Sequence, residues 1–477
     1  MAKYPRRWLV VLAIAWPAQL APAQIMAEKA HPAGAADDVR LSTAFPRFEC
    51  GFQGSDYWER EIRRAVADGL IADPSTRLLP QLPPRRPANA ARGTCLSPAQ
   101  IFPFEDTEGV LLTNFENAQM LDLLVEAANA LLAAHGDNYE FIGFWVNFTP
   151  HHTFGTAFYF LISNDIMGIG DVGAPVGEEP IFDRHKFFGL AGERIQGMVI
   201  MWNINSNFWS PGSGGDADFT RLVLGQEFEH RWALFLPDLA DGRALQGPNG
   251  SCGRRYHWNF KVDGQGSGME IAEWIGSNPA TRLGGTLHFN TDTGGVFSYT
   301  DLYLMGYVTP EEMDAGNSEL RYMDDSCASP YSGPISKFSS ADIIETAGPR
   351  NPDSGEAQHD YKTAWIMIHQ PGDPPSEAEL TKALGIHTQH QLDWNFGTLG
   401  RGTMDNALFT DCDCNGIPDA CTCLGDLDGD FVVGAADLAY LLGHWGPCVL
   451  CAADLDGDGA VGAPDLALLL GAWGACP

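Results

Sequence analysis

The chain of 477 residues is long enough for one large domain or for several smaller ones. Its hydrophobic content of 45% and its 13 tryptophans indicate a substantial packed core, which excludes a disordered chain. The net charge of −32 argues against nucleic acid and anionic lipid as partners.

The first 23 residues have the pattern of a secretory signal peptide. A positive region with Lys3, Arg6 and Arg7 precedes a short apolar run, and Ala-Pro-Ala at 21–23 fits a cleavage site. The apolar run is too short to cross a bilayer, and no later stretch reaches the required length. The sequence therefore predicts a secreted, extracellular protein without a membrane span.

The chain contains eleven cysteines, seven of them in the last 66 residues. Export permits disulfide bonds, which we expect here. The odd count leaves one thiol unpaired or paired with another chain, and the connectivity cannot be deduced from the sequence.

Residues 24–116 carry no motif with an identifiable chemistry. A proline- and arginine-rich stretch at 79–93 indicates a loop or linker, which a Cys50–Cys95 bridge would enclose. We interpret residues 24–116 as an N-terminal region that could serve as a prodomain-like cap.

Residues 117–410 have the periodicity of an α+β domain. Apolar positions at i, i+3, i+4 and i+7 predict a long helix over 117–135. A further helix is expected from Asp218 to Pro237, and strand and helix patterns over 361–410 complete the domain. Apolar runs separated by Gly, Pro and Asp turns predict strands at 139–148, 157–165 and 195–204.

The helix expected over 218–237 includes the sequence LGQEFEHRWALF. Gln226 and His230 lie one turn apart on the same face, and Glu227 lies beside them. In the zinc helix H-E-x-x-H, residues at these positions bind the metal and the acid acts as the general base. We therefore interpret Gln226 and His230 as zinc ligands and Glu227 as the catalytic base. An amide oxygen is a much weaker zinc ligand than the imidazole that usually stands at the first position.

Later segments offer further ligands for the same metal. His257 in YHWNF is the candidate third ligand, and Glu270 in GMEIAEW is the candidate fourth. Met305 in YTDLYLMGY lies where a zincin places its Met-turn beneath the metal. Alternatively, no metal is bound and Gln226 forms a hydrogen bond in a core.

The order of these landmarks resembles that of secreted bacterial proteins with a zincin-like, metzincin-like domain. The resemblance covers roughly 135–410 and includes FYFLISNDIMGIG, GQEFEHRW, YHW, GME, YTDLYLMGYVTPEE, ADIIETAGPRNP and GRGTMDNAL. It implies a mixed sheet with an active-site-type helix over 117–410, zinc as cofactor, a protein substrate and metallopeptidase-like activity. An inactive zincin-like protein that binds a ligand or partner is the alternative.

The end of the chain contains an internal duplication. Residues 425–446 and 453–474 are identical at sixteen of twenty-two aligned positions. From 402 onward there are twelve Asp but no Glu, Lys or Arg. Carboxylates at loop positions 1, 3, 5 and 12, with a backbone carbonyl at position 7, are the ligands of a calcium loop. In the first loop these residues are Asp426, Asp428, Asp430, Val432 and Asp437. In the second loop they are Asp454, Asp456, Asp458, Ala460 and Asp465.

Each loop is followed by D-L-A-x-L-L-G, which predicts a short helix that ends at Gly, with a Trp to pack between the two copies. These short loop–helix units resemble dockerin modules. The resemblance implies calcium-dependent docking of 425–477 to a cohesin-like or cell-surface protein partner. Phe431 replaces the turn Gly at position 6 of the first loop, so the second loop is predicted to bind calcium more tightly. Because dockerin-like modules often accompany polysaccharide-degrading enzymes, a carbohydrate-directed extracellular protein is a further alternative.

Residues 411–424 form a Cys-rich linker between the two parts. Its D-x-D-x-N-G-x-x-D pattern resembles a thrombospondin type 3 calcium motif. A disulfide-stapled linker and a zinc site built from its four cysteines are the alternatives. The calcium ligands expected here are Asp411, Asp413, Asn415 and Asp419.

Overall fold

The structure is a computed structural model in which part of the chain is described. The leader, all eleven cysteines and the linker 411–424 lie outside the described residues. In the described part, no helix is long and apolar enough to cross a membrane. The described residues are 55–82, 100–153, 157–171, 180–206, 217–247, 256–270, 272–275, 281–284, 297–317, 320–324, 333–409, 425–427, 432–447, 453–456 and 459–475.

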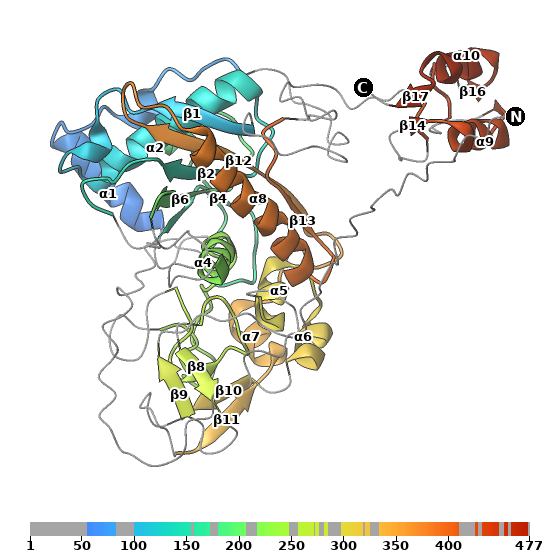
Figure 1. Cartoon of the computed structure of the whole chain (residues 1–477). Coiled ribbons are helices and arrows are strands. Elements are labelled where there is room, and N and C mark those ends of the chain that lie inside the picture. The colour runs from blue at the N-terminus through green and yellow to red at the C-terminus, as the bar shows by residue number, and fades with distance from the viewer. Residues whose placement is uncertain are drawn as a thin grey trace, which may run out of the picture. The chain divides into compact units, whose positions relative to one another are not determined.

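A six-stranded sheet forms the centre of an α+β main body (Figure 1). Neighbouring strands are parallel, except β3, which is antiparallel to β6 at one edge. The strand path is β1 (Ile101–Glu105), β12 (Asp360–His369), β2 (Phe141–Val146), β6 (Gly197–Asn203) and β3 (Phe158–Leu161), with β13 (Thr403–Asp405) paired to β12.

The other elements of the main body are helices, two short 3₁₀ turns and three small sheets. Its helices are α1 (Ser55–Ala67), α2 (Asn117–His135), α3 (His185–Phe188), α4 (Ala217–Glu229), α5 (Tyr299–Met305), α6 (Pro310–Gly316), α7 (Ser340–Ala347) and α8 (Glu377–Gly397), with short 3₁₀ turns at Pro74–Thr76 and Val110–Leu112. Three small sheets pair β4 (Ser163–Asn164) with β5 (Phe182–Asp183), β8 (Ala272–Ile275) with β9 (Thr281–Gly284), and β10 (Leu320–Met323) with both β7 (Val262–Asp263) and β11 (Ile335–Phe338).

The central sheet is buried on both faces because alternate side chains enter two separate apolar layers. In β2, Phe141 and Trp145 join the layer formed with α4, α5 and α8. Ile142, Phe144 and Val146 join the layer formed with α1 and α2. Burial of both faces explains why β2 reads as the continuous apolar run FIGFWV rather than as an alternating pattern.

Most of the elements predicted for the central domain are confirmed. The helix over 117–135 has the predicted bounds, and β2, β3 and β6 lie inside the three predicted apolar runs. A domain boundary was expected before residue 117. The described residues on the two sides of this position belong to one sheet, because β1 (Ile101–Glu105) is an edge strand paired with β12. Pro103 lies within β1, and an edge strand tolerates a proline because one side needs no backbone donor.

The prediction that the QExxH helix extends to Pro237 is wrong, because α4 ends at Glu229. The N–H groups of Trp232 and Ala233 both bond the carbonyl of Glu229, at 2.9 and 3.0 Å, which closes a turn. The apolar run that follows enters the core outside any helix. The N–H of His230 still bonds the carbonyl of Gln226 at 3.3 Å, so the one-turn relation between these residues is retained.

The C-terminal module, taken by itself, joins its two repeats by exchanging short strands. β14 (Val432–Val433) of the first loop pairs with β17 (Gly474–Ala475), and β16 (Ala460–Val461) of the second loop pairs with β15 (Gly446–Pro447). The helices α9 (Ala435–Gly443) and α10 (Ala463–Gly471) both end at the predicted Gly.

The predicted packing of a Trp between the two repeats is wrong. Trp445 and Trp473 are 50% and 49% exposed. The small core is filled instead by aliphatic residues from both repeats. These buried residues are Val433, Leu441, Ala453, Val461 and Leu469.

Helix α8 places two neutral histidines in the core of the main body. His387 accepts a hydrogen bond from Trp145 Nε1 at 3.0 Å and stacks on the ring of Trp365 at 4.1 Å. That stacking requires Gly143, since a Cβ there would lie 2.3 Å from the ring of Trp365. Burial lowers the pKa of His390 to about 4, and it lowers the pKa of His387 well below its usual range.

Replacing His390 by Gln should reduce the loss of stability in acid. A histidine in the unfolded chain takes up a proton near pH 6.5, whereas His390 stays neutral down to about pH 4. The unfolded state therefore binds more protons between these values, and stability falls as the pH drops through this window. The full shift corresponds to about 3 kcal/mol. Urea unfolding at pH 7.5 and 4.5 measures the loss, and an equal loss in wild type and variant would contradict the expectation.

Candidate functional site

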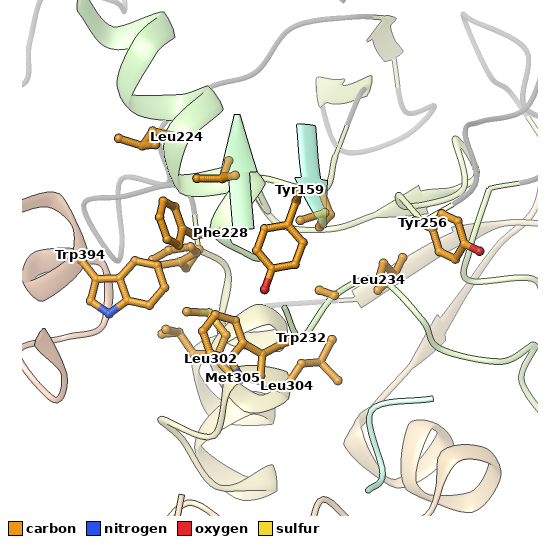
Figure 2. Close-up of a cluster of buried hydrophobic side chains, with 14 of the residues drawn as sticks. Tyr159, Leu224, Phe228, Trp232, Leu234, Tyr256, Leu302, Leu304, Met305 and Trp394 are labelled. Atoms are coloured by element: carbon orange, nitrogen blue, oxygen red, sulfur yellow. The ribbon is translucent and has the colours of Figure 1, made fainter. Parts of the chain in front are cut away.

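Helix α4 has an apolar face toward the sheet and a polar face toward residues 256–270. Leu224 and Phe228 belong to the apolar layer shown in Figure 2. In that layer the ring of Phe228 meets the ring of Phe141 edge-on, with 5.2 Å between their centroids. Gln226 follows Leu224 by two residues, and His230 follows Phe228 by two residues. At this spacing their side chains point to the opposite side, away from the apolar layer.

The structure brings three of the predicted zinc-site residues together. Nε2 of Gln226 lies 2.8 Å from Nε2 of His230 and 3.3 Å from Nε2 of His257. The two imidazole rings are 5.1 Å apart and nearly perpendicular, at 84°. All three side chains are buried, with at most 2% exposure. Gln226 of α4, His230 directly after the helix, and His257 from a separate segment therefore share a single buried site.

The imidazole of His230 is held neutral, with its Nε2 lone pair directed into the site. Its Nδ1 lies 3.1 Å from the carbonyl oxygen of Ala233, an acceptor that requires a proton on Nδ1. Burial and the neighbouring His257 lower the pKa of His230 well below its usual range. A neutral imidazole with a bonded Nδ1–H is the form in which histidine binds metal ions.

The distances from Gln226 to the two imidazoles can be compared with those between the ligands of a tetrahedral metal ion. Bonds of about 2.1 Å to a tetrahedral ion place neighbouring donor atoms about 3.4 Å apart. The Gln226 nitrogen lies close to that distance from His257 and nearer to His230. Rotation of the Gln226 amide by half a turn exchanges its nitrogen for the oxygen, which is the atom that could bind a metal.

The two predicted acids do not enter a three-membered group with the imidazoles. A possible metal site needs at least three His, Cys, Asp or Glu residues whose donor atoms lie within 4.8 Å of one another. Among the described residues, such a group occurs only in the second of the two predicted calcium loops. Glu227 is fully buried beside Gln226. Glu270 instead accepts hydrogen bonds from the N–H groups of Gly264 and Gly266, at 2.9 and 3.0 Å. Its carboxylate therefore closes the loop that follows His257.

The predicted Met-turn residue lies in the apolar layer. Met305 is the last residue of α5 and is fully buried near Leu302 and Trp232 (Figure 2). Gly306 follows in the left-handed conformation and ends the helix.

A buried polar cluster beside the site was missed in the sequence. Glu229, Ser267 and Asp301, here called the Asp301 cluster, are at most 3% exposed. Ser267 donates its hydroxyl proton to Asp301 at 2.8 Å, and the carboxyl group of Glu229 lies close to both residues. Burial raises the pKa of Asp301 to about 6 and that of Glu229 well above its usual range, so the two carboxyl groups can share a proton. The available signal was the S-x-x-D spacing of Ser298 and Asp301, which forms the capping box of α5.

The second calcium loop brings three predicted ligands together. The carboxylates of Asp454, Asp456 and Asp465 lie within 4.8 Å of one another. Gly459 has φ = +90°, as the turn at loop position 6 requires, and its N–H bonds Asp454 at 2.9 Å. The predicted carbonyl residue Ala460 lies in β16.

The position-12 aspartates have the same role in both loops. Asp465 accepts hydrogen bonds from the N–H groups of Leu455 and Gly462 at 2.7 and 2.6 Å. The bond from Gly462 lowers the pKa of Asp465, which therefore remains ionised. In the first loop, Asp437 accepts from Leu427 and Gly434 at 2.6 and 2.7 Å.

The remaining predicted calcium ligands divide into described and undescribed residues. Asp426 and Val432 are described, and Val432 lies in β14. The others lie outside the described residues, as does Phe431. They are Asp428, Asp430, Asp458, Asp411, Asp413, Asn415 and Asp419.

Comparison of the chain with protein-family models, with curated proteins and with solved structures finds no significant match.

The second calcium loop should depend more strongly on its first aspartate than the first loop does. Asp454→Ala removes a carboxylate that the Gly459 N–H already orients, whereas the first loop must place Phe431 at its turn position. A positive φ is unfavourable for a bulky residue, so the first loop should contribute less to the affinity. Calorimetric titration of calcium into both variants should show the larger loss for Asp454→Ala than for Asp426→Ala.

His444→Ala on α9 serves as the control for this titration. His444 is exposed and lies outside both loops, so the variant should titrate as the wild type does. A larger loss for Asp426→Ala would mean that the geometry of the turn position does not decide the affinity.

Proposed function

We propose that this chain is an exported, metallopeptidase-like protein. In this proposal a zincin-like domain binds zinc with His230, His257 and Gln226, and the C-terminal module attaches the protein to a partner in a calcium-dependent manner. The carrying observation is the convergence of the Gln226 amide with both imidazoles at 2.8 and 3.3 Å. An accidental amphipathic helix has no reason to meet a histidine from a separate segment at such distances.

The arrangement of elements supports a zincin-like domain. Helix α2, strands β2, β3 and β6, and then the site helix α4 follow one another as expected for a metzincin-like order. The sheet is mixed, with the antiparallel strand β3 at its edge. Zinc bound at this site would supply the Lewis acidity for hydrolysis of a peptide bond.

In this proposal Glu227 acts as the general base. It is the residue next to Gln226 on α4, and its carboxylate is fully buried in the interior. A buried carboxylate is poorly solvated, which favours proton uptake from a water molecule that enters the site. Glu227 therefore has the role of taking the proton, whereas the imidazoles hold the metal.

A second candidate is an inactive zincin-like protein that binds a partner. It is favoured by one specific observation, the donor geometry of Gln226. The amide NH₂ group has two protons, and two imidazole Nε2 atoms lie within hydrogen-bonding distance of it. Gln226 can therefore satisfy both imidazoles without any metal.

The C-terminal module has the surface of a protein-docking element. Each repeat exposes one leucine and one tryptophan at equivalent positions, and each of these side chains is about half exposed. Large apolar residues on a module this small favour a protein partner with an apolar surface, as in the cohesin-like alternative. The four residues are Leu442, Trp445, Leu470 and Trp473. Calcium in the two loops would hold the helices that carry these residues.

Glu227→Gln should abolish hydrolysis of an unfolded protein substrate by the full-length protein. The substitution removes the proton acceptor, and such groups contribute a factor of about 10² to 10⁴ to the rate. The zinc content per chain, measured by elemental analysis, should stay near that of the wild type because the acid does not hold the ion. A wild type without zinc and without hydrolysis would support the second candidate instead.

Gln226→His should raise the affinity for zinc by at least about tenfold, or about 1.4 kcal/mol. The new imidazole replaces a weak amide ligand at a position already near both histidines. Competition with a chromophoric chelator measures the change. An unchanged affinity would mean that position 226 does not face the metal.

A further inference from the structure

The segment that carries His257 needs external support to keep its conformation. Tyr256, the preceding residue, has φ = +65°, which is unfavourable for a bulky side chain. Such a conformation persists only where surrounding contacts determine it. On one side, the carbonyl of His257 accepts the N–H of Gly247 at 2.8 Å.

On the other side, a chain of hydrogen bonds leads from α5 to the neighbour of His257. Asp301 Oδ1 accepts the hydroxyl of Ser267 at 2.8 Å. The same hydroxyl oxygen accepts the N–H of Met269 at 3.1 Å. The carbonyl of Met269 then accepts the N–H of Trp258 at 3.0 Å. Because Trp258 follows His257 directly, this chain sets the position of the His257 backbone.

The chain of hydrogen bonds starts at a buried carboxylate whose position is fixed. Asp301 is fully buried, and its second carboxylate oxygen accepts the N–H of Ser298 at 2.6 Å within the capping box of α5. Glu229 of α4 contacts the same Asp301 and Ser267, and it directly precedes His230. The backbone of His257 is thus connected by hydrogen bonds to the Asp301 cluster, and His230 directly follows Glu229, a member of that cluster.

We propose that Ser267 and Asp301 are positioning residues that hold the His257 imidazole against Gln226 and His230. They act through the backbone of the loop 256–270 and do not touch the metal. The inference depends on the proposed function only where a metal is used as the probe. In the metal-free protein it concerns the hydrogen bond between Gln226 and His257, which the structure contains.

The test compares Ser267→Ala with Ser340→Ala in the full-length protein. Both variants remove a buried serine hydroxyl that donates to an aspartate, since Ser340 donates to Asp314 at 2.6 Å. The Ser340–Asp314 bond joins α6 and α7 and is not a member of the hydrogen-bond chain that leads from Asp301 to Trp258. Ser267→Ala leaves both partners of the α5 capping box in place. The pair therefore separates positioning of His257 from loss of a buried hydrogen bond in general.

The first measurement is the side-chain ¹⁵N resonance of His257 in the metal-free, histidine-labelled protein, assigned by its absence in His257→Gln. Ser267→Ala should shift or broaden this resonance, whereas Ser340→Ala should leave it at the wild-type frequency. Asp301→Asn should produce the same change if Ser267→Ala does not fold. An unchanged resonance in Ser267→Ala, or an equal change in both serine variants, would overturn the proposal.

The second measurement is the affinity for Co²⁺, followed by its visible absorption. Ser267→Ala should weaken binding about 10- to 100-fold, as loss of a group that orients a metal ligand commonly does. Ser340→Ala should bind as the wild type does, and equal weakening in both variants would overturn the proposal. If the wild type binds no Co²⁺, the proposed metal function fails, and the resonance of His257 still decides the positioning role.

Discussion

Burial of both faces of the central sheet is the constraint on which the candidate site depends. Because β2, β6 and β12 carry apolar side chains on both faces, each face must be covered by helices. Helix α4 covers one face with Leu224 and Phe228, and this fixes its rotation about its own axis. Gln226 and His230 then project toward the loop that carries His257. The polar site is thus a geometric consequence of apolar packing on the opposite side of one helix.

The last residue of α4 and the two residues that follow it fix the end of this helix. Glu229 contacts Asp301 and Ser267, and His230 bonds the carbonyl of Ala233. Arg231 is 1% exposed and donates to Asn164, Asp165 and Gln196 near the edge of the sheet. Buried polar groups without partners are costly, so the bonds of His230 and Arg231 disfavour rotation or sliding of the helix end. The network explains how a short helix can present His230 in a single orientation.

The C-terminal module depends on a different physical principle, in which two equivalent halves complete each other. Each loop contributes a two-residue strand that pairs with the chain after the helix of the other repeat. Neither repeat alone has a core, since the buried residues come from both. The aspartate at position 12 of each loop binds the loop backbone to the first turn of the following helix. The conformation of each loop is therefore coupled to the packing of the helix that follows it.

The sequence by itself determined the elements and the local motifs of this protein. The helix over 117–135, three strands, the one-turn spacing of Gln226 and His230 and the loop aspartates follow from periodicity and spacing over short distances. Only the tertiary structure decided that β1 and β12, far apart in the chain, lie side by side in the sheet. It also decided that α4 stops at Glu229, that Glu270 closes a loop, and that both module tryptophans are exposed. These features depend on which distant segments compete for a backbone carbonyl, a loop N–H or space in a small core. A pattern within one stretch of sequence cannot predict which distant segment will make the contact.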